Sequence, residues 1–200
     1  MEKRTSLTPT AQFRAGENDS GQKVLEGYFI RFNEETNLFD NYFESVSPDA
    51  ISDDIADQDI RALFDHDTSK VLGRTKSKTL TIRKDKEGLF GSVVINNDDQ
   101  EALSIYAKVA RGDVSSASFG FYINGDTLTE KKRGDGMTEF HDLLIDVELF
   151  EISIVAFPAY PTTEIGARSK DIEKFRAEKL SQRKSKLIEE LENKWKIQLS

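Results

Sequence analysis

The chain has 200 residues and a formal net charge of −8, a size that suits one compact domain with a short appendage. Its 37% hydrophobic residues, including 13 Phe and 5 Tyr, exclude a wholly disordered chain, because they are enough for a core. The absence of cysteine excludes disulfides, zinc–thiolate sites and thiol nucleophiles. No apolar run is long enough for a membrane span, so we expect no membrane partner.

The charge is divided between an acidic body and a basic end. Residues 1–167 hold 18 basic and 30 acidic side chains, whereas residues 168–200 hold 10 basic and 6 acidic ones. An acidic body argues against nucleic acid as the main partner, because the phosphate backbone is also anionic. We expect three segments: a flexible leader over residues 1–22 that is loose or weakly strand-like, a folded domain over 23–167, and a charged amphipathic helical tail over 168–200.

The predicted elements are mostly strands, taken here in chain order. Runs rich in β-branched and aromatic residues predict strands over residues 24–32, 39–46, 71–74, 80–84, 89–95, 114–123 and 140–157. Ser47 and the proline after it predict a short helix. Apolar residues at helical spacing predict a helix over 98–111, ended by Gly112. Residues 33–38 should form a turn and residues 124–137 a polar loop, so the fold class is mainly β with flanking helices.

The chain contains two histidines, the residue type that most often acts as a general base near neutral pH. His66 follows an apolar segment and lies between Asp65 and Asp67, at an expected strand or loop end. His141 lies beside the polar loop, at an expected strand edge. Taken alone, His66 is better explained as a surface residue beside acidic neighbours, and His141 as a histidine at a strand edge.

A serine-rich strand offers a candidate nucleophile. On this strand Ser116, Ser118 and Gly120 share one face, while Phe119 and Phe121 share the other. The Phe face is the expected core face, so Ser118 should point away from the core, beside a glycine that leaves room for a substrate backbone. Small residues that let a neighbouring element pack closely explain the same pattern, so the strand alone does not assign a nucleophile.

Glu151 interrupts a very apolar strand. Burying a carboxylate is unfavourable unless it is paired or hydrogen-bonded, so Glu151 predicts a buried partner, for which an imidazole is suited. The alternative is a glutamate that points to solvent at a sheet edge. Since no metal-binding motif, phosphate-binding loop or dinucleotide fingerprint is present, we expect no metal and no cofactor.

Taken together and in this order, the segments resemble the prohead protease family of tailed bacteriophages, serine proteases of capsid maturation whose fold is related to herpesvirus assemblin. The resemblance covers about residues 24–167. The motifs that carry it include Phe64-Asp65-His66-Asp67 followed by Val71-Leu72-Gly73-Arg74, Ser118-Phe119-Gly120-Phe121, and Glu151-Ile152-Ser153 with Pro158-Ala159. Each motif is weak alone, and their order and spacing make the resemblance specific.

The resemblance implies a role for each candidate. Ser118 matches the nucleophile of the family, His66 its general base, and Glu151 the acid that orients the imidazole. Ser116 is the alternative nucleophile, and Asp67 and His141 are the alternatives to Glu151 as the third member. The implied chemistry is acyl transfer through an acyl-enzyme.

The resemblance also implies a fold, substrates and a location. The fold would be a partly closed antiparallel β-barrel with helices outside, and the relation to assemblin implies a homodimer. The substrates would be the scaffold or the scaffolding segment of the major capsid protein, and the chain itself, inside the assembling prohead in the host cytoplasm. The tail over residues 168–200 would pair with a scaffold helix, be removed by self-cleavage, or pack on the body. Two other functions stay open: a catalytically inert β-barrel that binds scaffold during assembly, and a nucleic-acid-binding module that acts through the tail.

Overall fold

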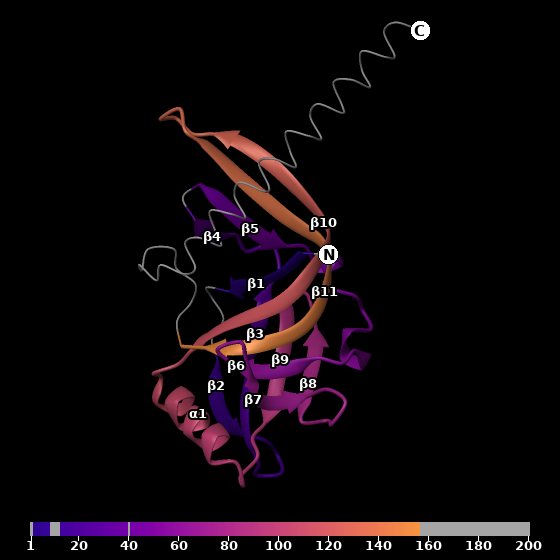
Figure 1. Ribbon diagram of the computed structural model, residues 1–200, viewed down its shortest axis with the longest axis vertical. Helices are drawn as coiled ribbons and strands as arrows, with labels where there is room; N and C mark the ends of the chain where they lie inside the picture. The colour runs from indigo at the N-terminus through magenta and orange to yellow at the C-terminus, as the bar shows by residue number, and fades with distance from the viewer. Residues whose placement is uncertain (1, 9–12, 40, 157–200) are drawn as a thin grey trace, which may run out of the picture. The chain divides into compact units, whose positions relative to one another are not determined.

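The structure, a computed structural model, describes residues 2–8, 13–39 and 41–156. Its elements in chain order are β1 (Glu2–Thr8), β2 (Arg14–Glu17), β3 (Lys23–Arg31), β4 (Thr36–Phe39), β5 (Tyr42–Val46), the 3-10 helices η1 (Pro48–Ala50) and η2 (Ile55–Asp57), β6 (Arg61–Phe64), β7 (Asp67–Arg74), β8 (Leu80–Lys84), β9 (Gly88–Val94), α1 (Gln100–Arg111), β10 (Ser116–Lys132) and β11 (Thr138–Val155). The described part of the chain is therefore mostly β with few helices, as the sequence predicts (Figure 1).

The strands form two sheets. The first sheet has the order β1-β10-β11-β5-β4, and its β6 pairs both with the C-terminal part of β11 and with β7. The second sheet has the order β2-β3-β9-β8. The expected partly closed antiparallel barrel is not confirmed, and the expected strand directions are corrected. The described strands do not close into a barrel, and β11 pairs in parallel with both β5 and β6. Apart from an isolated bridge between Phe32 and Val46, buried side chains rather than a backbone ladder join the two sheets.

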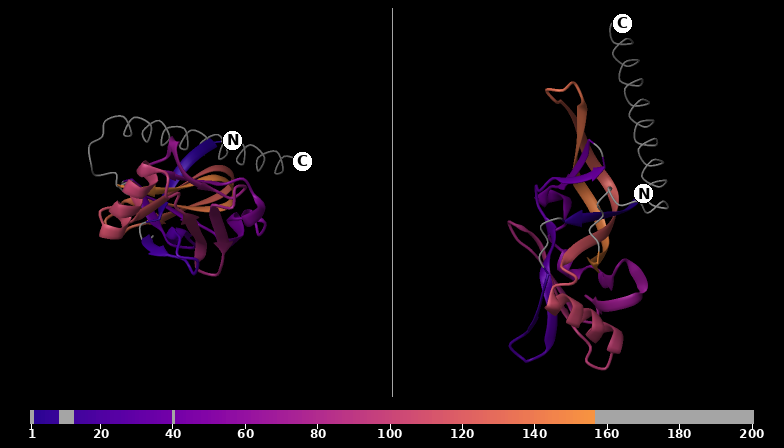
Figure 2. Two further views of the ribbon diagram at one scale, coloured as in Figure 1. Left: turned by 90° about the horizontal axis from the view of Figure 1, so that it is seen from below. Right: turned by 90° about the vertical axis from the view of Figure 1, so that its left-hand side faces the viewer.

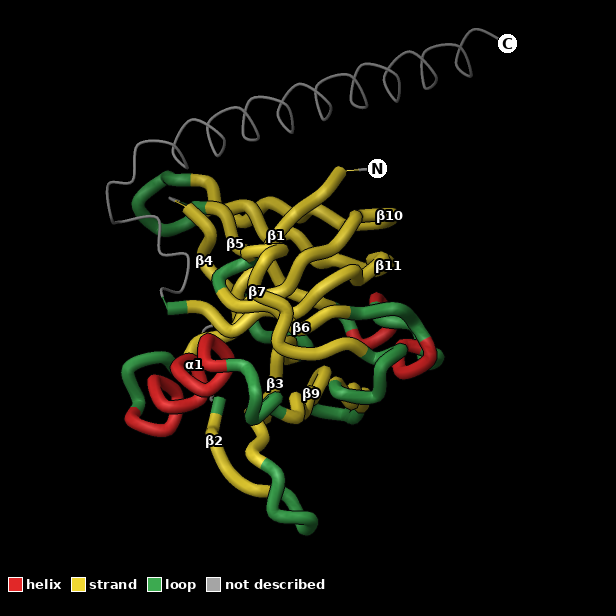
Figure 3. The backbone as a smooth tube through the Cα atoms, turned by 60° about the horizontal axis from the view of Figure 1, so that its bottom comes forward, coloured by secondary structure: helices red, strands yellow, loops and turns green. Residues whose placement is uncertain are grey.

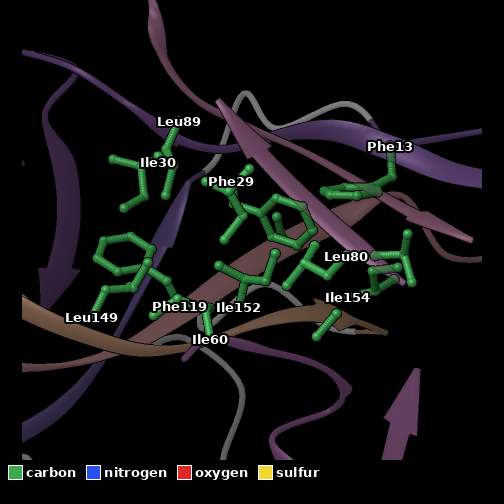
Figure 4. Packing of buried hydrophobic residues seen from close by; sticks show 14 of the residues in the cluster. Phe13, Phe29, Ile30, Ile60, Leu80, Leu89, Phe119, Leu149, Ile152 and Ile154 are labelled. Carbon is green, nitrogen blue, oxygen red and sulfur yellow. The ribbon is translucent and has the colours of Figure 1, made fainter. Parts of the chain in front are cut away.

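The core lies between the two sheets. Phe29 of β3, Phe119 of β10 and Ile152 of β11 are at most 1% exposed, and Figure 4 shows them packed together. Gly91 on β9 admits the Phe29 ring, because a Cβ there would lie only 2.5 Å from a ring carbon. Burying one such large side chain stabilises the fold by about 1.5–3 kcal/mol. This packing decides which faces of β10 and β11 are internal.

β10 and β11 form one long hairpin, whose outer part projects from the body (Figure 2). Its register runs from the Ser116–Val155 pair to the Lys132–Thr138 pair. The expectation of a loop over residues 124–137 is therefore wrong, because residues 124–132 continue β10. Residues 124–132 hold a single apolar side chain, Leu128, so the alternation that marks a half-buried strand is absent from this stretch.

The predicted helix and its end at Gly112 are confirmed, and the helix begins at Gln100, two residues later than expected. The Asp99 carboxylate accepts hydrogen bonds from two N–H groups of the first turn of α1, and Gly112 ends the helix with φ of 86°. Ser47 likewise caps η1, as its position before a proline predicts. The phenol of Tyr106 on α1 donates to the carbonyl of Gly16 at 3.2 Å, which holds the helix against β2 (Figure 3).

The two ends of the chain differ in what the structure describes. Residues 1–22 were expected to be loose or weakly strand-like. The strand-like expectation fits β1, which pairs with β10, and β2, which pairs with β3. The expected tail over residues 168–200 lies outside the described residues and stays a prediction. Among the described residues, the only α-helix is too short and too polar to cross a membrane.

Candidate active site

The register of β10 and β11 creates a face of polar and small residues. Partners in an antiparallel pair share a face, and the register joins Ser118 to Ser153 and Gly120 to Glu151. Between them, Phe119 and its partner Ile152 turn to the core. Ser118 therefore faces away from the Phe side of the strand, as predicted. Its side chain is nevertheless only 1% exposed, so the hydroxyl lies below the surface.

A β-bulge and a glycine together accommodate the carboxylate. The register shifts between Gly120 and Phe121, which leaves Phe150 as the extra residue on β11. A Cβ on Gly120 would overlap Oε1 of Glu151 and would lie 2.6 Å from Cζ of Phe150. The expectation that this glycine makes room for a substrate backbone therefore needs correction. The room is taken by the carboxylate and the ring.

His66 lies in a two-residue turn that joins β6 to β7. Phe64 pairs with Asp67, so Asp65 and His66 are the central residues, with φ of 51° and 58°. Positive φ at both positions is typical of a type I′ hairpin turn, and Asp and His are among the residues that adopt it most readily. The N–H of Asp65 donates to the carbonyl of Ile154 at 2.9 Å, which fastens the turn to β11.

This turn carries the imidazole between the serine and the glutamate. His66 Nε2 lies 2.7 Å from Ser118 Oγ, and His66 Nδ1 lies 2.7 Å from Glu151 Oε1. Because a carboxylate only accepts, Nδ1 carries the proton, which leaves the Nε2 lone pair to accept from the hydroxyl of Ser118. The side chains of His66 and Glu151 are 19% and 5% exposed, so water has little access to their contact. Three residues distant in the chain thus form one line of hydrogen bonds.

The alternative candidates make other contacts. The Asp67 carboxylate accepts from the hydroxyl and the N–H of Ser69 at 2.6 and 2.9 Å, and these hydrogen bonds lower the pKa of Asp67. His141 Nδ1 lies 2.6 Å from Glu35 Oε1, and the His141 ring stacks on Phe43. Ser116 lies two positions along β10 from the serine that His66 contacts. The structure brings together the three principal candidates rather than these alternatives.

Ser153 also belongs to the site, although in the sequence it is named only as part of a family motif, without a role. Its hydroxyl donates to Glu151 Oε2 at 2.7 Å and accepts from the N–H of His66 at 3.2 Å. The side chain is 0% exposed. The sequence does hold a signal for it, since a polar residue two positions after a buried glutamate on a strand shares the face of that glutamate.

The described residues offer no group of three or more His, Asp or Glu side chains that could hold a metal ion. The site presents a hydroxyl, an imidazole and a carboxylate in hydrogen-bonded sequence. Such a sequence can activate the hydroxyl as a nucleophile, because the imidazole can take its proton while the carboxylate holds the ring.

Comparison with known families gives a match over most of the chain. Residues 10–178 match the family described as caudovirus prohead serine protease. The matched range contains β2 to β11 and every residue of the site. No curated protein and no solved structure gives a match to the chain.

Proposed function

Given that the chain belongs to the caudovirus prohead serine protease family, we propose that it is a serine endopeptidase with Ser118 as nucleophile, His66 as general base and Glu151 as orienting acid. The family is one of phage capsid maturation, which acts in the assembling prohead in the host cell. The observation that carries the residue assignment is the pair of 2.7 Å contacts made by the two ring nitrogens of His66.

Acylation begins when a peptide carbonyl reaches Ser118. Nε2 of His66 takes the hydroxyl proton as Oγ bonds to the carbonyl carbon, and the carbonyl oxygen becomes an oxyanion. The imidazolium then gives this proton to the leaving amine, and the peptide C–N bond breaks. An ester on Ser118 and a free amine are the products of this half-reaction.

Deacylation repeats these steps with water as the nucleophile. His66 Nε2 takes a proton from water as the oxygen attacks the ester carbon, and then returns a proton to Ser118 Oγ as the ester bond breaks. The products are a free carboxyl group and the regenerated serine. His66 is thus the base for each attack and the acid for each departure.

The buried position of Glu151 supports its role beside His66. Accepting from Nδ1–H fixes the ring tautomer whose lone pair lies on Nε2, and the negative charge stabilises the imidazolium that forms in both half-reactions. At 5% exposure the carboxylate interacts with that charge through little water, which strengthens the attraction. Without this charge, proton transfer to His66 would be less favourable.

The substrates proposed from the family are the scaffold, or the scaffolding segment of the major capsid protein, and the chain itself. A protease that acts on such segments works within the assembling prohead. The proposed partners also include a second copy of the chain, through the relation to assemblin. Residues 168–200 would contribute by pairing with a scaffold helix or by being removed through self-cleavage.

The proposed function is tested by co-expressing the chain with the major capsid protein of its phage, including any scaffolding segment. Intact masses of both proteins are compared for the unmodified chain, Ser118→Ala and Ser116→Ala. We expect shortened products with the unmodified chain and Ser116→Ala, and full-length masses with Ser118→Ala. Undiminished processing by Ser118→Ala would eliminate Ser118 as the nucleophile, and loss of processing in Ser116→Ala would assign that role to Ser116. Full-length masses with the unmodified chain would favour an inert assembly protein.

A further inference from the structure

Ser153 occupies the position on β11 directly opposite Ser118 on β10. It is fully buried and makes two hydrogen bonds that lead to two different parts of the site. One runs from its hydroxyl to Oε2 of Glu151 at 2.7 Å, and the other runs to its oxygen from the N–H of His66 at 3.2 Å. The buried hydroxyl of Ser153 thus connects the carboxylate of Glu151 with the backbone of His66.

The first of these bonds leaves the carboxylate held at both oxygens. Oε1 of Glu151 accepts from Nδ1 of His66, while Oε2 accepts from Ser153. Turning the carboxylate about its terminal bond would break one or both contacts. Because Glu151 and Ser153 are two positions apart on one strand, the backbone itself sets the distance between them.

The second bond acts on the turn that carries His66. Both central residues of this turn have positive φ, which L-residues other than glycine adopt at a cost, so contacts with the surroundings must hold it. Two hydrogen bonds fasten Asp65: its N–H donates to Ile154, and its carboxylate accepts from the N–H of Ala156 at 2.8 Å. The bond to Ser153 fastens His66 itself.

We propose that Ser153 is a positioning residue, which holds the Glu151 carboxylate and the His66 turn in the mutual arrangement that directs Nε2 at Ser118. The inference rests on the proposed function, since it concerns the same site. Ser153 contacts neither the reacting hydroxyl nor the atom that takes its proton in the hydrogen bonds described. Its effect on catalysis is therefore indirect, through the placement of two neighbours.

The kinetic test compares Ser153→Ala, Ser153→Thr and a matched control, Ser92→Ala, which removes a half-buried strand hydroxyl from β9 in the other sheet. Loss of a hydrogen bond to a charged group should lower kcat roughly 10-fold to 100-fold, with KM little changed. Ser153→Thr keeps the hydroxyl and should recover part of the loss. The control should match the unmodified chain.

A second readout does not depend on turnover. The proton on His66 Nδ1, held by a carboxylate, gives a downfield NMR signal, and His141→Gln assigns it because the chain has two histidines. We expect Ser153→Ala to shift or broaden this signal and Ser92→Ala to leave it unchanged. An unchanged signal in Ser153→Ala, or no such signal in the unmodified chain, overturns the proposal. A changed signal in a chain that cleaves nothing would instead keep the positioning role and refute the proposed function.

Discussion

The two halves of the β10–β11 hairpin are continuous in the chain but differ in environment. At the base, Phe119 and Ile152 are buried against the second sheet, so the opposite face is fixed in register. In the outer half, residues 124–137 are mostly exposed on both faces. A one-residue slip at the base would turn Ser118 to the core in place of Phe119, whereas residues 124–132 of the outer half hold no buried residue for a slip to exchange. Of the two halves, only the base carries residues of the proposed triad, and His66 comes from the β6–β7 turn.

The largest expected effect is the loss of the general base. His66→Gln keeps a side chain of similar length but provides no nitrogen that can take and return the proton of Ser118. We expect kcat for peptide cleavage to fall by about a millionfold, to the level of Ser118→Ala. Cleavage rates for the two single variants and the double variant check this, because residues that act as one unit give non-additive losses.

The next largest effect is expected at the acid. Glu151→Gln preserves shape and removes the charge that stabilises the imidazolium, so kcat should fall by about ten-thousandfold. Stopped assays of cleavage with purified variants measure this effect. A fall of less than about tenfold would take Glu151 out of the mechanism, since a neutral amide would then serve equally well.

Gly120 tests the space that the base of the hairpin reserves for the carboxylate. Gly120→Ala introduces a Cβ where Oε1 of Glu151 lies, so the carboxylate must move away from His66. We expect kcat to fall by about a hundredfold, with a small loss of thermal stability, because one charge-assisted contact is displaced. Gly134→Ala in the turn of the outer half is the matched control, since a Cβ there meets no atom within 4 Å. Equal activity of the two variants would contradict the packing argument.

The smallest effect is expected in the outer half of the hairpin. Replacing residues 131–139 by Asn-Gly joins the paired residues Glu130 and Phe140 through a two-residue turn. Cleavage of a short peptide should stay within about twofold of the unmodified chain, because exposed residues away from the core contribute little to its stability. A large loss of peptide cleavage would show that the outer half takes part in the site and would break the contrast between the two halves.

The sequence predicts those parts of the fold in which local pattern and burial agree. α1 could be predicted because Asp99 and Gly112 cap a periodic apolar face, and the base of β10 because Phe119 and Phe121 alternate with small residues. The β10 side of the outer half could not, since residues 124–132 pair with β11 without burying an apolar face of their own. The parallel pairing of β11 with β5 and β6 was also missed, because it joins segments whose partners no local pattern specifies.

The same division applies to the site. Ser118, His66 and Glu151 were identified by residue type and by a family resemblance. Their contact depends on the pairing of strands that are distant in the chain, which no local sequence pattern specifies. Gly120 was read as space for a substrate, because the bulge at Phe150 that fills this space is visible only in the paired strands. The role of Ser153 was missed because it depends on a turn eighty-seven positions away in the chain.

The most direct test of the central claim is covalent labelling with a fluorophosphonate, which reacts with a serine only where a base has activated it. We expect one adduct by intact mass, mapped to Ser118 by peptide sequencing, and no adduct in His66→Gln. Labelling of another serine, or equal labelling of Ser118 with and without the imidazole, would contradict the claim that His66 and Ser118 act as one unit.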